Sequence, residues 1–187
     1  KLGEGIPNNA SQEILQQHVQ HTLSMISGIS EVDILNYPKM TDRKKLMTMK
    51  LLARLQASSY YADPVVHNFI ILKMVQLTLS SGLSPVAPFG FVCFGSFIAK
   101  IGDLAAGHRL SLLAKSLLTS PDTKDFAGSV ISRLAEILSY VEPLPAANEL
   151  RIQGEVAAIS VGATQSACVC RCLYVFNRYW TGGQLSI

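Results

Sequence analysis

Apolar residues along most of the chain recur at intervals of three and four, the spacing that places side chains on one face of an α-helix. The clearest apolar stripes are Leu15, Val19, Leu23 and Ile26; Met47, Leu51 and Leu55; and Val130, Leu134, Ile137 and Val141. No alternation of apolar and polar residues is long enough to predict strands. The pattern therefore predicts an all-α protein in which each stripe faces the core.

Residues typical of helix ends divide this pattern into separate helices. The predicted helices cover residues 11–27, 41–58, 65–80, 85–100, 104–118, 125–140, 146–161 and 164–180, with a short segment at 30–38. The predicted N-cap residues are Asn9 or Ser11, Thr41 or Asp42, Ser84 ahead of Pro85, and Asp103.

Helix-breaking residues recur near positions 62, 82, 102, 122, 142, 162 and 182, about every twenty residues. The pair Gly82 and Ala87 returns as Gly162 and Ala167. A helical hairpin of about forty residues, repeated along a chain, is typical of an α-solenoid of stacked antiparallel hairpins. We expect one helical repeat domain over 1–187, with N-terminal helices in 1–63 and three hairpins in 64–187. Because the last hairpin ends with the chain, we expect the parent protein to continue beyond Ile187.

The composition indicates extensive burial. Hydrophobic residues make up 49% and charged residues 16% of the chain, against about 25% charged in a typical soluble domain. Much of the chain is therefore expected to be buried in the domain or docked on a larger assembly. The net charge of +3 is mild, and nucleic-acid-binding proteins usually carry a stronger, clustered basic excess.

One uncharged stretch, from Met74 to Ala99, is long enough to raise the question of a membrane span. It is interrupted by Gly82, Pro85 and Pro88, which a spanning helix would have to accommodate without water. Two buried helices joined by a tight turn explain the same residues, so we predict no membrane span and a cytoplasmic protein.

The four cysteines are Cys93, Cys168, Cys170 and Cys172. Three of them crowd into one predicted helix, where neighbouring positions lack the geometry of a disulfide. A metal site would need a second cysteine pair, which the sequence lacks. We therefore predict reduced, buried cysteines and no metal.

The histidines offer no metal site either. His18 and His21 have a spacing that two ligands could use, but no third ligand lies nearby, and glutamines surround them. We interpret both as solvated. His67 and His108 stand alone and are predicted to be ordinary, partly buried side chains.

A basic cluster around the second predicted helix has Asp42 as its one local acid. Its members are Lys39, Arg43, Lys44, Lys45, Lys50 and Arg54. Such a cluster could meet nucleic acid, anionic lipid or an acidic protein. Because no aromatic residues are interleaved, a solvated face is favoured over a nucleic-acid site. A contact with a partner protein stays open.

No pattern of catalytic residues is recognisable. The chain has no phosphate-binding loop, dinucleotide fingerprint or nucleophile elbow. Its carboxylates are scattered, and none pairs with a neighbour as acid–base catalysis requires. We predict no catalytic residue, no cofactor and no enzymatic activity.

The order and spacing of many residues resemble a known family across most of the chain. The similarity rests on Leu35, Pro38, Met40 and Asp42; on Ile71–Val75, Leu77, Leu79 and Gly82; on Ala87, Phe91, Gly95, Gly102, Asp103, Gly107, Leu113, Ala114 and Leu117; and on Glu142–Leu144, Gly162, Ala167, Tyr179, Trp180, Gly182 and Leu185. These residues resemble the helical region of large signalling proteins that combine a serine/threonine-kinase-like domain, an AAA-type predicted ATPase, a GAF domain and a histidine kinase. The chain departs from the family at Arg43, His108 and Ala163.

The resemblance implies a tetratricopeptide-like arm between the ATPase module and the sensor and kinase domains. Its expected function is a non-enzymatic protein-interaction or relay scaffold, which binds a protein partner or neighbouring domains of its own chain. Phe91, Phe94, Arg171 and Tyr174 are expected to line a concave face. The alternative is a sensor that holds a small apolar effector around Phe89, Phe91, Cys93 and Phe94. Any kinase or ATPase activity would belong to other domains, and the oligomeric state stays open.

Overall fold

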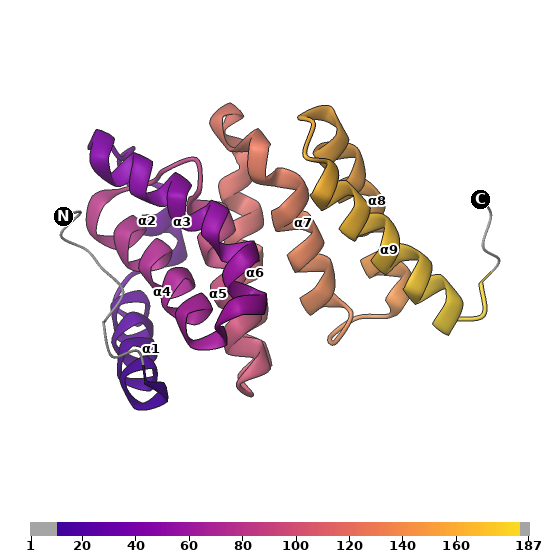
Figure 1. Ribbon diagram of the computed structural model, residues 1–187, viewed down its shortest axis with the longest axis horizontal. Coiled ribbons are helices and arrows are strands. Elements are labelled where there is room, and N and C mark those ends of the chain that lie inside the picture. Colours follow the sequence, from indigo (N-terminus) through magenta and orange to yellow (C-terminus); the bar gives the residue numbers. More distant parts are fainter. Residues whose placement is uncertain (1–10, 184–187) are drawn as a thin grey trace. The chain divides into compact units, whose positions relative to one another are not determined.

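The computed structural model describes residues 11–183, and within this range the chain consists of helices with no β-strand (Figure 1). The helices are α1 (Gln12–Ser27), α2 (Glu31–Leu35), α3 (Arg43–Ala62), α4 (Pro64–Ser81), α5 (Ala87–Lys100), α6 (Leu104–Ser116), α7 (Lys124–Leu138), α8 (Leu144–Ser160) and α9 (Thr164–Trp180), with 3-10 turns η1 (Leu117–Thr119) and η2 (Pro121–Thr123). The all-α prediction is confirmed. The described residues form two compact units, one up to Gly90 and one from Phe91 onward, which divide within α5.

Three helices, α1, α3 and α6, begin at a predicted capping residue. Ser11 accepts a hydrogen bond from the Ile14 N–H, Asp42 caps α3, and Asp103 caps α6. The other candidate for the first cap, Asn9, lies outside the described residues. The prediction for Ser84 is wrong, because α5 begins only at Ala87 and the Ser84 hydroxyl is buried without a hydrogen-bond partner.

Glycines with positive φ occupy four of the predicted breaks. Gly82, Gly102, Gly162 and Gly182 have φ between 66° and 113°, a region that other residues rarely adopt. At Gly82 there is also no room for a side chain, because a Cβ would collide with the Pro38 carbonyl oxygen. The chain is held there by a bridge in which the Met40 N–H donates to Leu83 and the Leu83 N–H donates to Pro38.

In the first unit, α4 is the central element and packs against both α1 and α3. It is apolar on nearly all sides, and most of its residues from His67 to Leu79 are buried. The Gln76 side-chain amide of α4 donates to the buried Thr22 hydroxyl of α1 at 2.9 Å. Among the described residues, no helix has the length and apolar character needed to cross a membrane.

The predicted core stripe of α3 is wrong. Met47, Leu51 and Leu55 lie at the surface, whereas Met49 and Leu52 are buried. The buried side of α3 also includes Gln56 and Ser59, so the more apolar side of the helix faces outward. In α1 the predicted stripe is correct for Leu15 and Val19, while Leu23 and Ile26 are partly exposed.

In the second unit, helices approach one another closely at small residues. Gly95 of α5 meets Gly107 of α6, and Gly128 of α7 meets Gly154 and Ala158 of α8. Helix α8 packs between α7 and α9 (Figure 1).

The predicted stripe of α7 is confirmed for Val130, Leu134 and Ile137, which are buried; Val141 follows the end of the helix and is exposed.

Candidate functional site

An exposed stripe on α3 combines apolar and basic side chains. Met47, Leu51 and Leu55 are 57%, 47% and 52% exposed, and their spacing of four residues places them on one side of the helix. We call this surface the α3 face, defined by Arg43, Met47, Lys50, Leu51, Arg54 and Leu55, all of them exposed. Three large apolar side chains in water make the α3 face a candidate for contact with another molecule.

The α3 face is strongly basic. Helix α3 contains five basic residues and no acidic one. The nearest carboxylate, Asp42, accepts hydrogen bonds from the backbone N–H groups of Lys44 and Lys45 at 2.8 and 3.2 Å. The Lys45 ammonium turns toward α4 and donates to the Ser81 hydroxyl at 2.7 Å. Of the predicted basic cluster, the structure places Arg43, Lys44, Lys50 and Arg54 on the exposed side of α3, and Lys39 lies at the bridge to Leu83.

The second unit holds a pocket of about 390 Å³. It is lined by Ser96, Ala99 and Lys100 from α5, Leu104 from α6, Glu136 and Ile137 from α7, and Tyr140. Most of this lining is apolar, and the charged groups come from Lys100 and Glu136. These residues are far apart in the sequence, so no local motif could have indicated the pocket.

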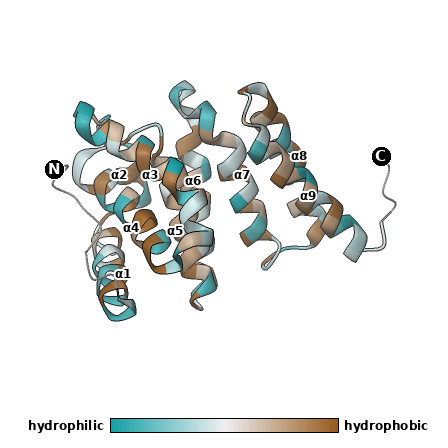
Figure 2. Cartoon of the chain, in the orientation of Figure 1, coloured by the Kyte–Doolittle hydropathy of each residue, from teal (hydrophilic) through white to brown (hydrophobic). Residues whose placement is uncertain are grey.

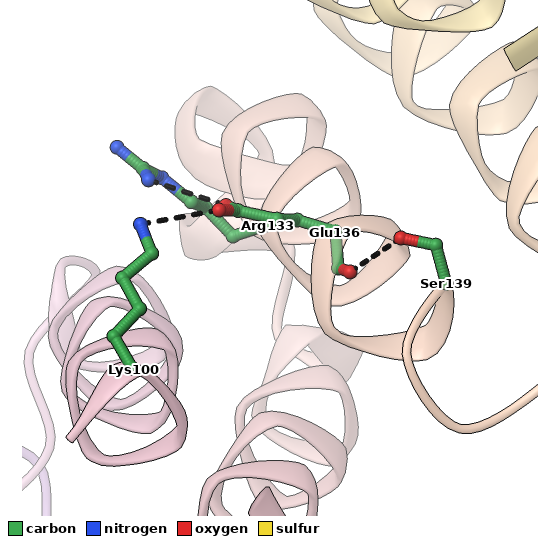
Figure 3. A network of polar contacts seen from close by, with 4 residues as sticks. All are labelled: Lys100, Arg133, Glu136 and Ser139. Carbon is green, nitrogen blue, oxygen red and sulfur yellow. Dashed lines mark hydrogen bonds and ion pairs between the residues drawn. The ribbon is translucent and has the colours of Figure 1, made fainter. Parts of the chain in front are cut away.

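A small network of charges stands at this pocket (Figure 3). One Glu136 carboxylate oxygen lies 3.1 Å from the Lys100 ammonium, and the other lies 3.4 Å from the Arg133 guanidinium. The Ser139 hydroxyl donates to the backbone carbonyl of Glu136 at 2.6 Å. The Lys100–Glu136 pair therefore connects α5 to α7 beside the pocket.

The predicted effector site lies elsewhere and is filled. Phe89, Phe91, Cys93 and Phe94 are all buried, so their side chains form core rather than an opening. For the same reason, the prediction that Phe91 and Phe94 line a concave face is wrong. Arg171 is exposed; it pairs with Glu155 at 2.9 Å and lies over the ring of Tyr174.

The cysteines divide into two kinds. Cys93 and Cys170 are buried, whereas Cys168 and Cys172 are exposed, contrary to the prediction that all are buried; all four are free thiols. Burial raises the pKa of Cys93 to about 11 and also raises the pKa of Cys170. Both buried thiols are therefore held in the protonated form, which is a poor nucleophile.

The histidines have structural contacts. His67 is buried, with its Nδ1 atom 3.0 Å from the Gln56 carbonyl oxygen, and so joins α4 to α3. His18 is partly buried and packs edge-on against Phe69, so its predicted solvation is only partial; His21 is exposed. In the part of the chain that the structure describes, no group of three or more His, Cys, Asp or Glu residues is placed to hold a metal.

Two features escaped sequence analysis. Helices α8 and α9 expose a series of large apolar side chains, and Figure 2 shows hydrophobic segments on both helices. These residues are Ile152, Val156, Ile159, Val169, Leu173, Val175, Phe176, Tyr179 and Trp180. Arg151 on α8 is only 3% exposed, and its Nε and Nη1 atoms have no hydrogen-bond partner. Burial lowers the pKa of its guanidinium.

Comparison of the chain with known protein families, with characterised proteins and with solved structures found no match. The function is therefore argued from the two sites that the geometry defines. These are the α3 face in the first unit and the pocket beside Lys100 and Glu136 in the second.

Proposed function

We propose that this chain is a protein-interaction scaffold without enzymatic activity, built as a tetratricopeptide-like solenoid with a repeat of about forty residues. The left-handed glycines at 82, 102, 162 and 182 support the repeat, because they end helices at related positions. The resemblance to the helical region of multidomain signalling kinases supports a relay role between neighbouring domains.

The observation that carries the proposal is the α3 face. A solvated helix face is expected to be polar, and here Met47, Leu51 and Leu55 stand in water instead. Lys50 and Arg54 lie beside them without an acidic residue on the same helix. Such a surface favours a partner that offers apolar side chains flanked by carboxylates.

The partner that fits is an acidic amphipathic helix. Met47 to Leu55 spans about 12 Å along α3, since each residue of a helix rises by about 1.5 Å. A partner helix with apolar residues at positions i, i+4 and i+7 presents anchors over this length. Glutamates beside those anchors would pair with Lys50 and Arg54, which steers the encounter and sets the orientation.

The test is a titration of the chain with two fluorescent helical peptides of the same apolar pattern, one rich in glutamate and one rich in lysine. We expect the acidic peptide to bind at least about tenfold more tightly than the basic peptide, and to weaken as salt is added. The double charge reversal Lys50→Glu and Arg54→Glu should exchange this preference. Leu51→Asp should abolish binding, whereas Lys115→Glu, a reversal of an exposed lysine on α6, should leave it unchanged.

Other outcomes contradict the proposal. Equal binding of both peptides, or binding that survives Leu51→Asp, would mean that the α3 face is not the site. Tight binding to vesicles rich in anionic lipid, without binding to the acidic peptide, would identify the α3 face as a membrane-contact surface instead.

A further inference from the structure

The pocket of the second unit joins an apolar wall to a cationic edge. Ala99, Leu104 and Ile137 provide the apolar wall, and the Lys100 ammonium stands beside them. Ligand pockets of about 300–1,000 Å³ commonly combine such a lining with a few polar groups that fix orientation. At about 390 Å³, this pocket suits a small molecule with one apolar body and one polar end.

The charge at the pocket favours an anion. The Glu136 carboxylate pairs with both Lys100 and Arg133, and the buried guanidinium of Arg151 lies within electrostatic reach of the same carboxylate. Lys100 and Arg133 thus share one carboxylate, and an anion bound at the pocket would give the Lys100 ammonium a second acceptor.

Lys100 is the group placed to receive this anion. An ammonium has three N–H donors, and the Glu136 carboxylate accepts from this one at 3.1 Å. The Lys100 side chain is 49% exposed, so it can reorient without opening the core. Lys100 lines the pocket together with the apolar residues, and lysine often combines an apolar stem with a charged end at such mixed sites.

We propose that this pocket binds a small amphipathic carboxylate, with its apolar body against Ala99, Leu104 and Ile137 and its carboxylate on the Lys100 ammonium. This activity goes beyond the scaffold function, and it uses residues of the second unit only. A neutral apolar molecule would make no ionic contact with the Lys100 ammonium. The carboxylate of the ligand instead accepts a charge-assisted hydrogen bond from the Lys100 ammonium. This bond lies at the edge of an apolar surface, where such bonds are stronger than in open water.

The test compares octanoate with 1-octanol, which have the same chain length and differ in charge. Binding is measured by titration calorimetry on the full chain, and the site is mapped by amide chemical-shift changes. We expect saturable binding of octanoate, at least about tenfold tighter than that of octanol. The shift changes should concentrate on the last two turns of α5 and on α7 around Glu136.

Four variants assign the binding to individual groups. Lys100→Met keeps the stem and removes the charge, so octanoate affinity should fall about tenfold, to the level of octanol. Ala99→Phe should abolish the binding of both molecules by filling the pocket. Glu136→Gln removes the competing carboxylate and should strengthen octanoate binding. Lys115→Met, an exposed lysine on α6, should leave the affinity unchanged.

Circular dichroism of each variant establishes that a loss of binding is not a loss of fold. Equal affinity for octanoate and octanol would overturn the proposal, as would octanoate binding that Lys100→Met leaves intact. Absence of saturable octanoate binding to the unmodified chain would overturn it as well. None of these results bears on the α3 face, which the peptide titration tests separately.

Discussion

Gly95 of α5 and Gly107 of α6 face each other where neither position has room for a side chain. A Cβ on Gly107 would lie 2.5 Å from the Gly95 carbonyl oxygen, and a Cβ on Gly95 would lie 2.7 Å from the Gly107 carbonyl oxygen. Both distances are far below van der Waals contact, and backbone atoms cannot swing aside as a flexible side chain can. The two helices of this pair are therefore held together at backbone distance.

The first prediction follows from this contact. Gly107→Ala should lower the free energy of unfolding by about 1–3 kcal/mol, because the added methyl group forces the helices apart. Helix propensity alone would favour alanine by about 1 kcal/mol, so the sign of the change distinguishes the two effects. Chemical denaturation measures this change in the free energy of unfolding. Gly28→Ala is the control, since a Cβ there meets its nearest atoms at 3.9 Å; equal effects of both substitutions would contradict the account.

The buried Arg151 leads to a prediction of opposite sign. Its Nε and Nη1 atoms lack hydrogen-bond partners, and such a loss of hydration typically costs about 1–3 kcal/mol. Arg151→Met keeps most of the volume and removes the buried donors, so the melting temperature should rise. Arg171→Met, which removes an exposed pair with Glu155, should change stability by less than about 1 kcal/mol. A lower melting temperature for Arg151→Met would show that its charge stabilises the fold.

The cysteines should react in two classes. Cys168 and Cys172 are exposed and should be alkylated in the native protein, whereas Cys93 and Cys170 should react only after unfolding. Because burial raises the pKa of Cys93 from 9.0 to about 11, its thiolate should form only at strongly alkaline pH. Mass spectrometry of alkylated protein, with and without denaturant, counts the modified sites. Rapid native labelling of Cys93 near neutral pH would contradict its burial.

The same pKa shift of Cys93 predicts a pH dependence of stability. The folded protein holds the Cys93 proton more tightly than the unfolded chain does, so its contribution is complete below pH 9 and is lost as pH rises toward about 11. Cys93→Ala removes the titrating group, although it also leaves a cavity. The variant should therefore lose stability less steeply over this interval, as measured by denaturation at a series of pH values. Parallel curves for the two proteins would argue against the shift.

Asp63, the N-cap residue of α4, also contributes to the stability of the fold. One Asp63 carboxylate oxygen accepts hydrogen bonds from the Val65 and Val66 N–H groups at 2.9 and 3.1 Å. Asp63→Ala should cost about 0.5–2 kcal/mol, and Asp63→Ser should retain most of the stability because serine is also an effective cap. Thermal denaturation compares the two. If serine and alanine prove equally destabilising, the carboxylate acts through something other than capping.

Local signals account for most of what sequence analysis predicted correctly. Asp42 and Asp103 mark helix starts, and Gly102 and Gly162 mark helix ends, because capping and positive φ depend on a few neighbouring residues. Boundaries moved where two signals competed, as at Ser84, where the chain turns through Pro85 before the helix begins. The basic character of the α3 face was also visible, since its cations follow one another closely along the chain.

The sequence by itself determined that the chain is helical and where several helices begin and end, because hydrophobic period and caps act within a few residues. Only the tertiary structure decided which side of α3 faces inward, since the side that packs against α4 includes Gln56 and Ser59 and is not the more apolar one. It also decided that Phe91 is core and that Lys100 meets Glu136 beside a pocket. Contacts between helices join residues that are far apart in the sequence, so no short segment predicts them.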